Sequence, residues 1–479
     1  MLGPEEIDAI SRGVWELDCP EMTLTDFSGS PVHRGPGWVR QIDKGQLAFK
    51  LFAAVVPREI VLKSGGAVGQ LVPDSAYDEL RAVDSVGRMW KAQRLLPGQY
   101  RTESETVILT GDIWRMQASS EACPSDRSTF DMWWFVDLDF PSNTVTHVQT
   151  SRSGRPVHES ASRNAARFSA CGVDFELVKT DRSVRLRGES NGGMRPNFET
   201  RAAEALLFVL GRSLPCTVLE KHEAGTRWVE VSSLPRTPLE PRLGAPIGFR
   251  DPRVADDVWR LFGLYLAHIL PYKPAEGEGW LHPLSERIEL LIEASCASVD
   301  VEGLVLGVAV EDVLRTEFKE LGTPSPEMQT EIDRAMTLIA DSDLRPELKK
   351  RIRSAVGNMK SARAEDRLRS LVDAGAIMLE QVESWRNLRN FFAHSHRFNE
   401  RKDSQELLDL CGKVLVLFYH LIFWRIGYCG SYTDYGSEGY PTRQYRATSA
   451  SSGGGDCSPR MDEAEATVTA DESCEADDE

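Results

Sequence analysis

A proline-rich stretch from residue 234 to residue 253 separates two parts of the chain that have different hydropathy patterns. It contains five prolines, at positions 235, 238, 241, 246 and 252. Proline lacks a backbone N–H and fixes φ, so a closely spaced series of prolines continues neither a helix nor a central strand. We therefore predict a domain boundary here, with a first domain over residues 1–245 and a second over residues 246–430.

The first part has the patterns of a β-rich domain. Apolar residues recur at every second position from Leu47 to Ala53, which is the period of a half-buried strand. Four further segments have similar patterns and are bounded by Gly, Pro, Ser or Asp: 106–116, 129–140, 144–150 and 173–187. Regularly spaced strands of this kind predict a sandwich or an open barrel. A helix over 199–210 that ends at Gly211, and a hairpin over 217–231, complete the domain.

The second part is helical in pattern. Amphipathic or apolar segments cover 254–270, 285–295, 304–321, 345–359, 364–398 and 404–426, and the pair Ser325-Pro326 is a typical start for one more helix. Such a series predicts an antiparallel helical bundle, so the fold class is α+β. The apolar run 414–424 is shorter than the roughly 20 residues that span a bilayer. We interpret it as a buried core helix and expect no membrane association.

The C-terminal segment 431–479 lacks helical periodicity. Its first half is rich in Ser, Gly and Tyr, and residues 456–479 hold ten acidic residues and one arginine, which supply −9 of the net charge of −17. A segment with so few apolar side chains cannot bury enough surface to offset the entropy of ordering it. We predict that 431–479 is a disordered acidic tail.

Composition limits the classes of function. With the tail removed the chain carries −8, so a nucleic-acid site would have to be a local basic patch. The nine cysteines form no C-x-x-C pair and no Cys/His cluster with zinc spacing, and the first residues do not resemble a secretory signal. We therefore expect a cytoplasmic protein that needs neither a metal nor another cofactor.

One segment carries residues suited to RNA chemistry. Arg389, Asn390 and His394 lie within six residues on a predicted helix. Metal-independent RNA cleavage needs a base for the 2′-OH, an acid for the leaving 5′-oxygen, and a cation for the charged phosphorane. Histidine titrates near neutral pH, and arginine presents forked donors that suit phosphate oxygens.

This Arg-Asn-x-x-x-His pattern resembles the catalytic motif of HEPN domains, the helical ribonucleases of toxins and phage-defence systems. A β-rich N-terminal half followed by such a bundle is similar to the ApeA-like anti-phage defence proteins. The resemblance implies an endoribonuclease with His394 as general acid or base, Arg389 as phosphate ligand and Asn390 as a positioning amide. It also implies an active site at the interface of a homodimer or higher homo-oligomer formed through the HEPN domain, and products with 2′,3′-cyclic phosphate ends.

Three further residues stay open as alternative or supporting members of the site. His396 forms an Arg-x6-His pattern with the same arginine, and Arg386 could add a phosphate contact. Glu311, on the predicted helix 304–321, could orient Arg389 or His394, although a surface carboxylate is an equally good interpretation.

The resemblance therefore implies abortive infection through cleavage of cellular RNA, with tRNA among the candidate substrates. The β-rich domain would sense or regulate, and it is where a phage-derived trigger would bind. The alternative is a non-catalytic HEPN module for binding or dimerisation, attached to a β-rich ligand-binding domain.

Overall fold

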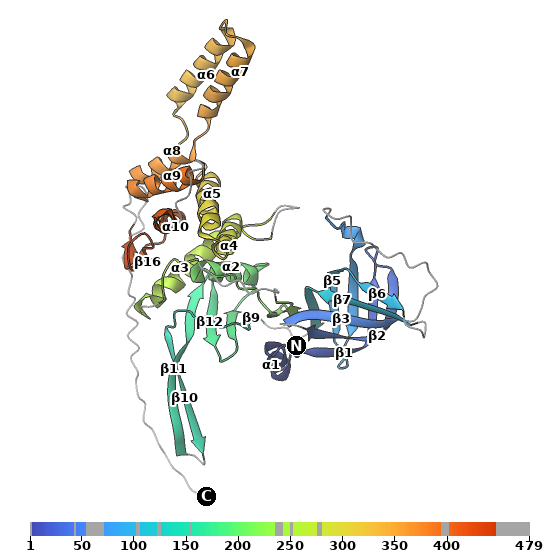
Figure 1. The fold of residues 1–479 in the computed structure, drawn as a ribbon. Helices are drawn as coiled ribbons and strands as arrows, with labels where there is room; N and C mark the ends of the chain where they lie inside the picture. The colour runs from blue at the N-terminus through green and yellow to red at the C-terminus, as the bar shows by residue number, and fades with distance from the viewer. Residues whose placement is uncertain are drawn as a thin grey trace.

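The computed structural model describes residues 2–42, 45–53, 71–101, 106–121, 126–152, 155–234, 243–249, 252–274, 280–393 and 402–446 (Figure 1). The α+β fold class is confirmed, because a large antiparallel sheet in the first half of the chain precedes a helical second half. The proline-rich stretch predicts two separate domains, but one apolar core contains residues from both halves of the chain.

Fifteen strands form one continuous antiparallel sheet, in the order β10-β11-β12-β13-β9-β14-β15-β8-β5-β4-β1-β2-β3-β7-β6. The strands are β1 (Glu16–Thr25), β2 (Pro31–Ile42), β3 (Gln46–Ala53), β4 (Asp78–Val83), β5 (Met89–Leu95), β6 (Gly98–Arg101), β7 (Val107–Ile113), β8 (Arg115–Glu121), β9 (Ser128–Trp134), β10 (Thr144–Arg152), β11 (Arg155–Ala170), β12 (Val173–Lys179), β13 (Val184–Ser190), β14 (Val218–Glu223) and β15 (Thr226–Ser232). The expected hairpin is confirmed as β14 and β15, which turn through Ala224 and Gly225 at positive φ.

Strands of the sheet contribute side chains to two separate apolar cores. Strands β1–β8 curl around the first core (Figure 1), and β5 and β7, which are not neighbours in the sheet, come into contact. Trp15 and Trp90 meet there edge to face, with ring centroids 5.7 Å apart. The alternation predicted for β3 is confirmed, since Leu47, Phe49 and Leu51 are all buried in this core.

Strand β9 contributes to both cores. Phe130, Met132 and Trp134 are buried in the second core, whereas the intervening Trp133 packs against the first. Successive side chains of a strand point to opposite faces, so a single strand can line two cores at once.

The second core runs from the sheet into the helices. It joins β9 and β11–β13 to the helix α2 (Phe198–Leu210) and to the helices that follow. Phe168 on β11 stacks on Trp259 with ring centroids 4.3 Å apart, and Trp259 donates from Nε1 to the carbonyl of Pro141 at 3.0 Å. The predicted boundary at residue 246 therefore does not divide the apolar core, because aromatic residues on both sides of it pack together. Most of the prolines that suggested it lie outside the described residues.

The helices of the second half are α3 (Ala255–Ile269), α4 (Pro283–Ser295), α5 (Val299–Glu317), α6 (Pro326–Asp341), α7 (Pro346–Gly357), α8 (Ala364–Asp373), α9 (Leu379–Ala393) and α10 (Lys402–Ile426), and α1 (Pro4–Ser11) lies at the N-terminus. Ser325 caps α6 as expected, since its hydroxyl accepts from the backbone N–H of Met328. The single helix predicted over 364–398 is wrong. Gly375, at a φ of +72°, follows the end of α8, and α9 begins four residues later.

Helix α10 is the centre of the bundle. Its residues 404–426 are the one described segment with the length and mean hydropathy, 1.7, of a membrane span, but 67% of that window is buried inside the protein. Leu417, Phe418 and Leu421 are fully buried. The expectation of a buried core helix over 414–424 fits this packing.

The chain after α10 is ordered as far as residue 446, contrary to the tail predicted from 431. Strands β16 (Gly430–Thr433) and β17 (Thr442–Tyr445) form a hairpin, and Tyr432 and Tyr445 are buried. Tyr445 donates to the carbonyl of Ala376 at 3.0 Å. The prediction was wrong for 431–446 because it counted Tyr as part of a polar segment, whereas these tyrosines bury large rings in the bundle. Residues 447–479 lie outside the described part of the chain.

Candidate functional site

The Arg-Asn-His segment falls on α9, whose apolar side is fixed in the bundle. Trp385 and Leu388 are buried, and Trp385 donates from Nε1 to the carbonyl of Gly307 on α5 at 3.3 Å. The ring of Phe392 lies so close to Gly303 that a Cβ there would sit 3.0 Å from it. Helix α5 therefore contacts α9 at two places, through the carbonyl of Gly307 and through the close approach of Phe392 to Gly303.

The opposite side of α9 faces solvent and carries Arg386, Arg389 and Asn390, all exposed. Their spacing of three and four residues places them on one helical face. Asn390 is next to Arg389 along this face, as the motif requires.

Arg389 is paired with Glu311 of α5. Its Nε lies 2.7 Å from Oε1 of the carboxylate, with the two side chains 59% and 35% exposed. The guanidinium also lies over the ring of Trp385, 5.7 Å from the centroid. Glu311 thus contacts one of the two residues that the sequence proposed for it, while a catalytic role for the pair remains a prediction.

Arg386, about one turn earlier on the same face of α9, makes an equivalent pair. It binds Glu365 of α8, which also binds Arg369 at 2.9 Å. These neighbouring arginines hold the pKa of Glu365 below its usual value through their hydrogen bonds and charge. Each arginine of the α9 face is therefore matched by a carboxylate, and this described surface is balanced in charge rather than strongly basic.

His394 and His396 lie outside the described residues, which resume at residue 402. The structure follows α9 to Ala393, one position before the first of them. The choice between the Arg-x4-His and Arg-x6-His patterns therefore stays as open as the sequence left it.

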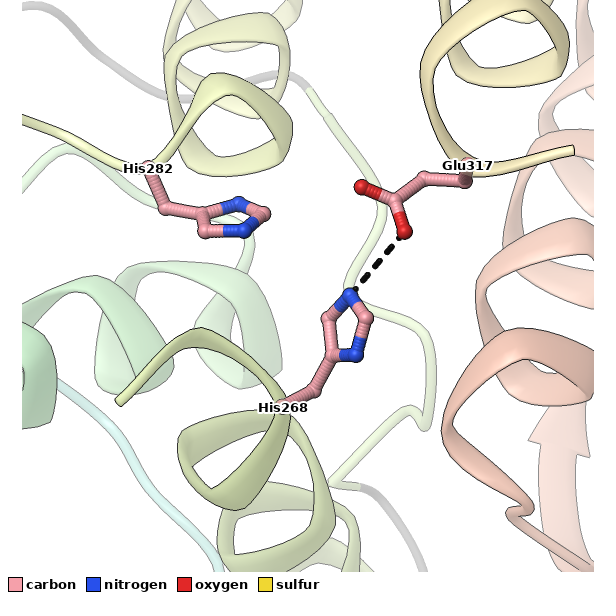
Figure 2. Close-up of side chains that lie close together, drawn as sticks. All are labelled: His268, His282 and Glu317. Atoms are coloured by element: carbon pink, nitrogen blue, oxygen red, sulfur yellow. Dashed lines mark hydrogen bonds and ion pairs between the residues drawn. The ribbon is translucent and has the colours of Figure 1, made fainter. Parts of the chain in front are cut away.

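A second cluster of ionisable residues lies inside the bundle, and the sequence did not predict it. His268 near the end of α3, His282 at the N-cap of α4 and Glu317 at the end of α5 converge (Figure 2), with one ligand-type atom of each within 4.8 Å of the others. Nε2 of His268 lies 3.1 Å from Oε2 of Glu317, and Arg425 of α10 donates to the same oxygen at 2.9 Å.

Burial and neighbouring charge set the protonation of this cluster. Burial lowers the pKa of His282 to about 4, so its ring is neutral at physiological pH. Burial opposes ionisation of Glu317, but the hydrogen bond and charge of His268, together with the bond from Arg425, outweigh it and bring its pKa to about 2.

Two histidines and a glutamate are a possible zinc ligand set, but the hydrogen bonds of His282 do not suit one. Its Nδ1 accepts from the backbone N–H of Leu284 at 3.1 Å. A neutral imidazole has one N–H, so the proton must sit on Nε2, the atom that faces the cluster, and a protonated nitrogen cannot bind a metal. We interpret the cluster as a buried polar junction that ties α3, α4, α5 and α10 together. The three residues are far apart in sequence, so only the fold brings them together and no local spacing could have predicted them.

No protein-family model, curated protein or solved structure matches this chain. The interpretation of the site therefore depends on its geometry and on the motif.

Proposed function

We propose that the protein is a metal-independent endoribonuclease of the HEPN type that acts in anti-phage defence. The observation that carries the proposal is the position of Arg389. It lies on the solvent-exposed face near the end of a helix otherwise fixed by buried residues, Glu311 orients it, and Asn390 and the two candidate histidines follow it in sequence. A guanidinium positioned by a carboxylate suits the charged phosphorane of RNA cleavage, because it supplies charge-assisted N–H donors to phosphate oxygens.

In the proposed mechanism, Arg389 binds the non-bridging phosphate oxygens and Asn390 positions the substrate. His394 exchanges protons with the 2′-OH or the leaving 5′-oxygen. The 2′-oxygen attacks phosphorus as it loses its proton, and the 5′-oxygen leaves as it gains one, giving a 2′,3′-cyclic phosphate and a 5′-OH. The reaction needs no metal and no cofactor.

A second copy of the chain would supply a second histidine. The α5 helix supports such a dimer, because Val301, Leu304 and Val308 are between 42% and 52% exposed and lead along one face of α5 towards Glu311. An exposed apolar stripe is typical of an interaction surface. A homodimer through this face would place two Arg389 sites near one another.

The same stripe favours the second candidate function, a non-catalytic HEPN module that dimerises and carries a ligand-binding β-rich half. This candidate predicts a dimer that cleaves no RNA at any protein concentration. The nuclease is the stronger proposal, because dimerisation alone does not require an arginine held by a carboxylate beside the stripe.

The test is expression of the wild type and the Arg389→Ala/His394→Ala variant in a bacterial host, with and without phage, followed by sequencing of RNA ends. Cyclic-phosphate ends that appear only with the wild type are the expected result, and they would identify the substrate RNA. Single His394→Ala and His396→Ala variants then assign the catalytic histidine. RNA cleavage that persists in both single variants, with Arg389→Ala also active, would contradict the proposal.

A further inference from the structure

The helices α6 and α7 form a hairpin that extends away from the rest of the bundle (Figure 1). We call residues 325–360 the arm. Ile332 is the one buried residue of α6, and α7 has none. Paired helices ordinarily bury an apolar stripe between them and against a third element, so the arm leaves apolar surface without a covering layer.

Large apolar side chains are exposed along the whole arm. Leu338 is 64% exposed, and the others are at least 38% exposed: Met328, Leu344, Leu348 and Met359. Single exposed apolar residues are ordinary, but several on one slender hairpin indicate a surface that is covered by a partner.

The two helices of the arm carry opposite charge. Helix α6 has four acidic residues against one arginine, and α7 has four basic residues against one glutamate. Lys350, Arg351 and Arg353 on α7 have no carboxylate within ion-pair distance among the described residues. On α6, Asp333 pairs at 2.5 Å with Lys360, a residue that follows α7 in the chain. Most of these charges are therefore available to a partner.

This distribution of charge identifies the kind of partner. An RNA bound along α7 would also approach the acidic α6, which repels phosphate. A second copy of the arm has no such conflict, because a two-fold axis places α6 of each copy against α7 of the other and forms the same favourable pairing twice. The exposed apolar side chains of both arms would then lie in the centre of a four-helix bundle.

We propose that the arm is a homotypic docking element, through which two copies of this chain associate by packing α6 and α7 of one arm against α7 and α6 of the other. The arm and the Arg389 face are separate surfaces, since the arm's charged and apolar residues make none of the contacts described for Arg389. The proposal therefore stands whether or not the protein cleaves RNA. If the α5 face also associates, the two surfaces together assemble four copies.

Reciprocal charge reversal tests this proposal in the full-length chain. One variant reverses α7 (Lys350→Glu/Arg353→Glu) and another reverses α6 (Glu331→Lys/Asp341→Lys). A matched control reverses two exposed lysines outside the arm (Lys91→Glu/Lys319→Glu). Glutamate and lysine are both good helix formers, and circular dichroism checks that each variant remains folded. The masses are measured by light scattering at about 50 mM salt, where surface charges are weakly screened.

The expected result is that each arm variant alone has half the mass of the wild type and of the control. An equimolar mixture of the two arm variants should regain the wild-type mass, because each reversed helix then meets its complement. The proposal would be overturned if the wild type had the mass of a single chain. It would also be overturned if both arm variants and their mixture had the same mass as the wild type. Unchanged masses with reduced RNA retention on a filter for the α7 variant would overturn it in favour of an RNA-binding arm.

Discussion

Arg389 on α9 and Glu311 on α5 are joined by an ion pair, with Nε of the guanidinium 2.7 Å from Oε1 of the carboxylate. An exposed ion pair of this kind contributes only about 0–1 kcal/mol to the free energy of unfolding. Its effect is instead to limit the positions that a long, mobile side chain can adopt at the exposed face of α9. If Arg389 binds the phosphate of the substrate, this restriction holds the guanidinium in a reactive position and so raises the rate of RNA cleavage.

The first prediction concerns this restriction. Glu311→Gln should lower the RNA cleavage rate about 10-fold, because it removes an orienting charge worth roughly 1.4 kcal/mol in the transition state, and should shift the melting temperature little. The matched control is Glu365→Gln, which breaks the equivalent pair with Arg386 and should leave the rate within about two-fold. Initial rates on the substrate RNA and thermal melts measure both. A larger loss of rate in Glu365→Gln than in Glu311→Gln would assign the functional arginine to Arg386.

The shared core predicts how the chain can be divided. A fragment of residues 246–446 loses the partners of Trp259 and Tyr265, which stack on Phe168 and Phe208 with centroids 4.3 and 4.4 Å apart. Loss of buried aromatic contacts costs about 3–5 kcal/mol for each ring, so this fragment should bind a hydrophobic dye and melt without a cooperative transition. A fragment of residues 126–446 retains those partners and serves as the control. Cooperative melting of the shorter fragment would show that the bundle is independent of the sheet.

The ordered end of the chain gives a third prediction. A chain that stops after residue 446 should be as stable as the full chain in denaturant titrations, because the described contacts are all kept. A chain that stops after residue 429 loses the rings of Tyr432 and Tyr445, which lie against His420 with centroids 4.7 Å away. We expect it to lose about 3–5 kcal/mol or more in the free energy of unfolding. Equal stability of the two shortened chains would contradict the packing role of the β16–β17 hairpin.

The fourth prediction concerns pH. The pKa of His282 is lowered to about 4 in the folded protein, against roughly 6.5 when unfolded. Between these values the unfolded state binds a proton that the folded state does not, so stability falls as the pH falls. His282→Asn keeps an N-cap acceptor for α4 and removes this titration.

Denaturant titrations between pH 7 and pH 5 provide the measurement. The slope of the unfolding free energy against pH should be smaller in His282→Asn by up to about 1.4 kcal/mol per pH unit. Glu317, whose pKa is about 2 in the folded state, stabilises the fold above its unfolded pKa, and this stability is lost as the pH falls from about 4.5 to about 2. Most of that loss lies below the window of pH 7 to pH 5, and it is common to the variant and the wild type. Identical slopes in the variant and the wild type would show that folding does not lower the pKa of His282.

Local patterns predicted the local structure well. The turn at Ala224-Gly225 and the cap at Ser325 depend on neighbouring residues alone, so the sequence contains what determines them. The break between α8 and α9 was missed because a glycine in a helical pattern can be tolerated, and only tertiary packing decides whether it ends the helix.

Features that depend on distant residues were the ones that the sequence did not predict. The burial of Tyr445 requires a carbonyl at Ala376, and the junction around Glu317 requires the ends of several helices to meet. For the candidate site, the motif named Arg389 and Asn390 from local spacing, but Glu311 could be selected from the many acidic residues only as a hypothesis, because its partner lies on another helix.

The two cores share strand β9, with Trp133 on one side of it and Met132 and Trp134 on the other. The hydrogen bonds of β9 also join it to β13 on one side and to β14 on the other. A substitution that displaces this one strand would therefore disturb the packing of both cores, although it lies in the first half of the chain.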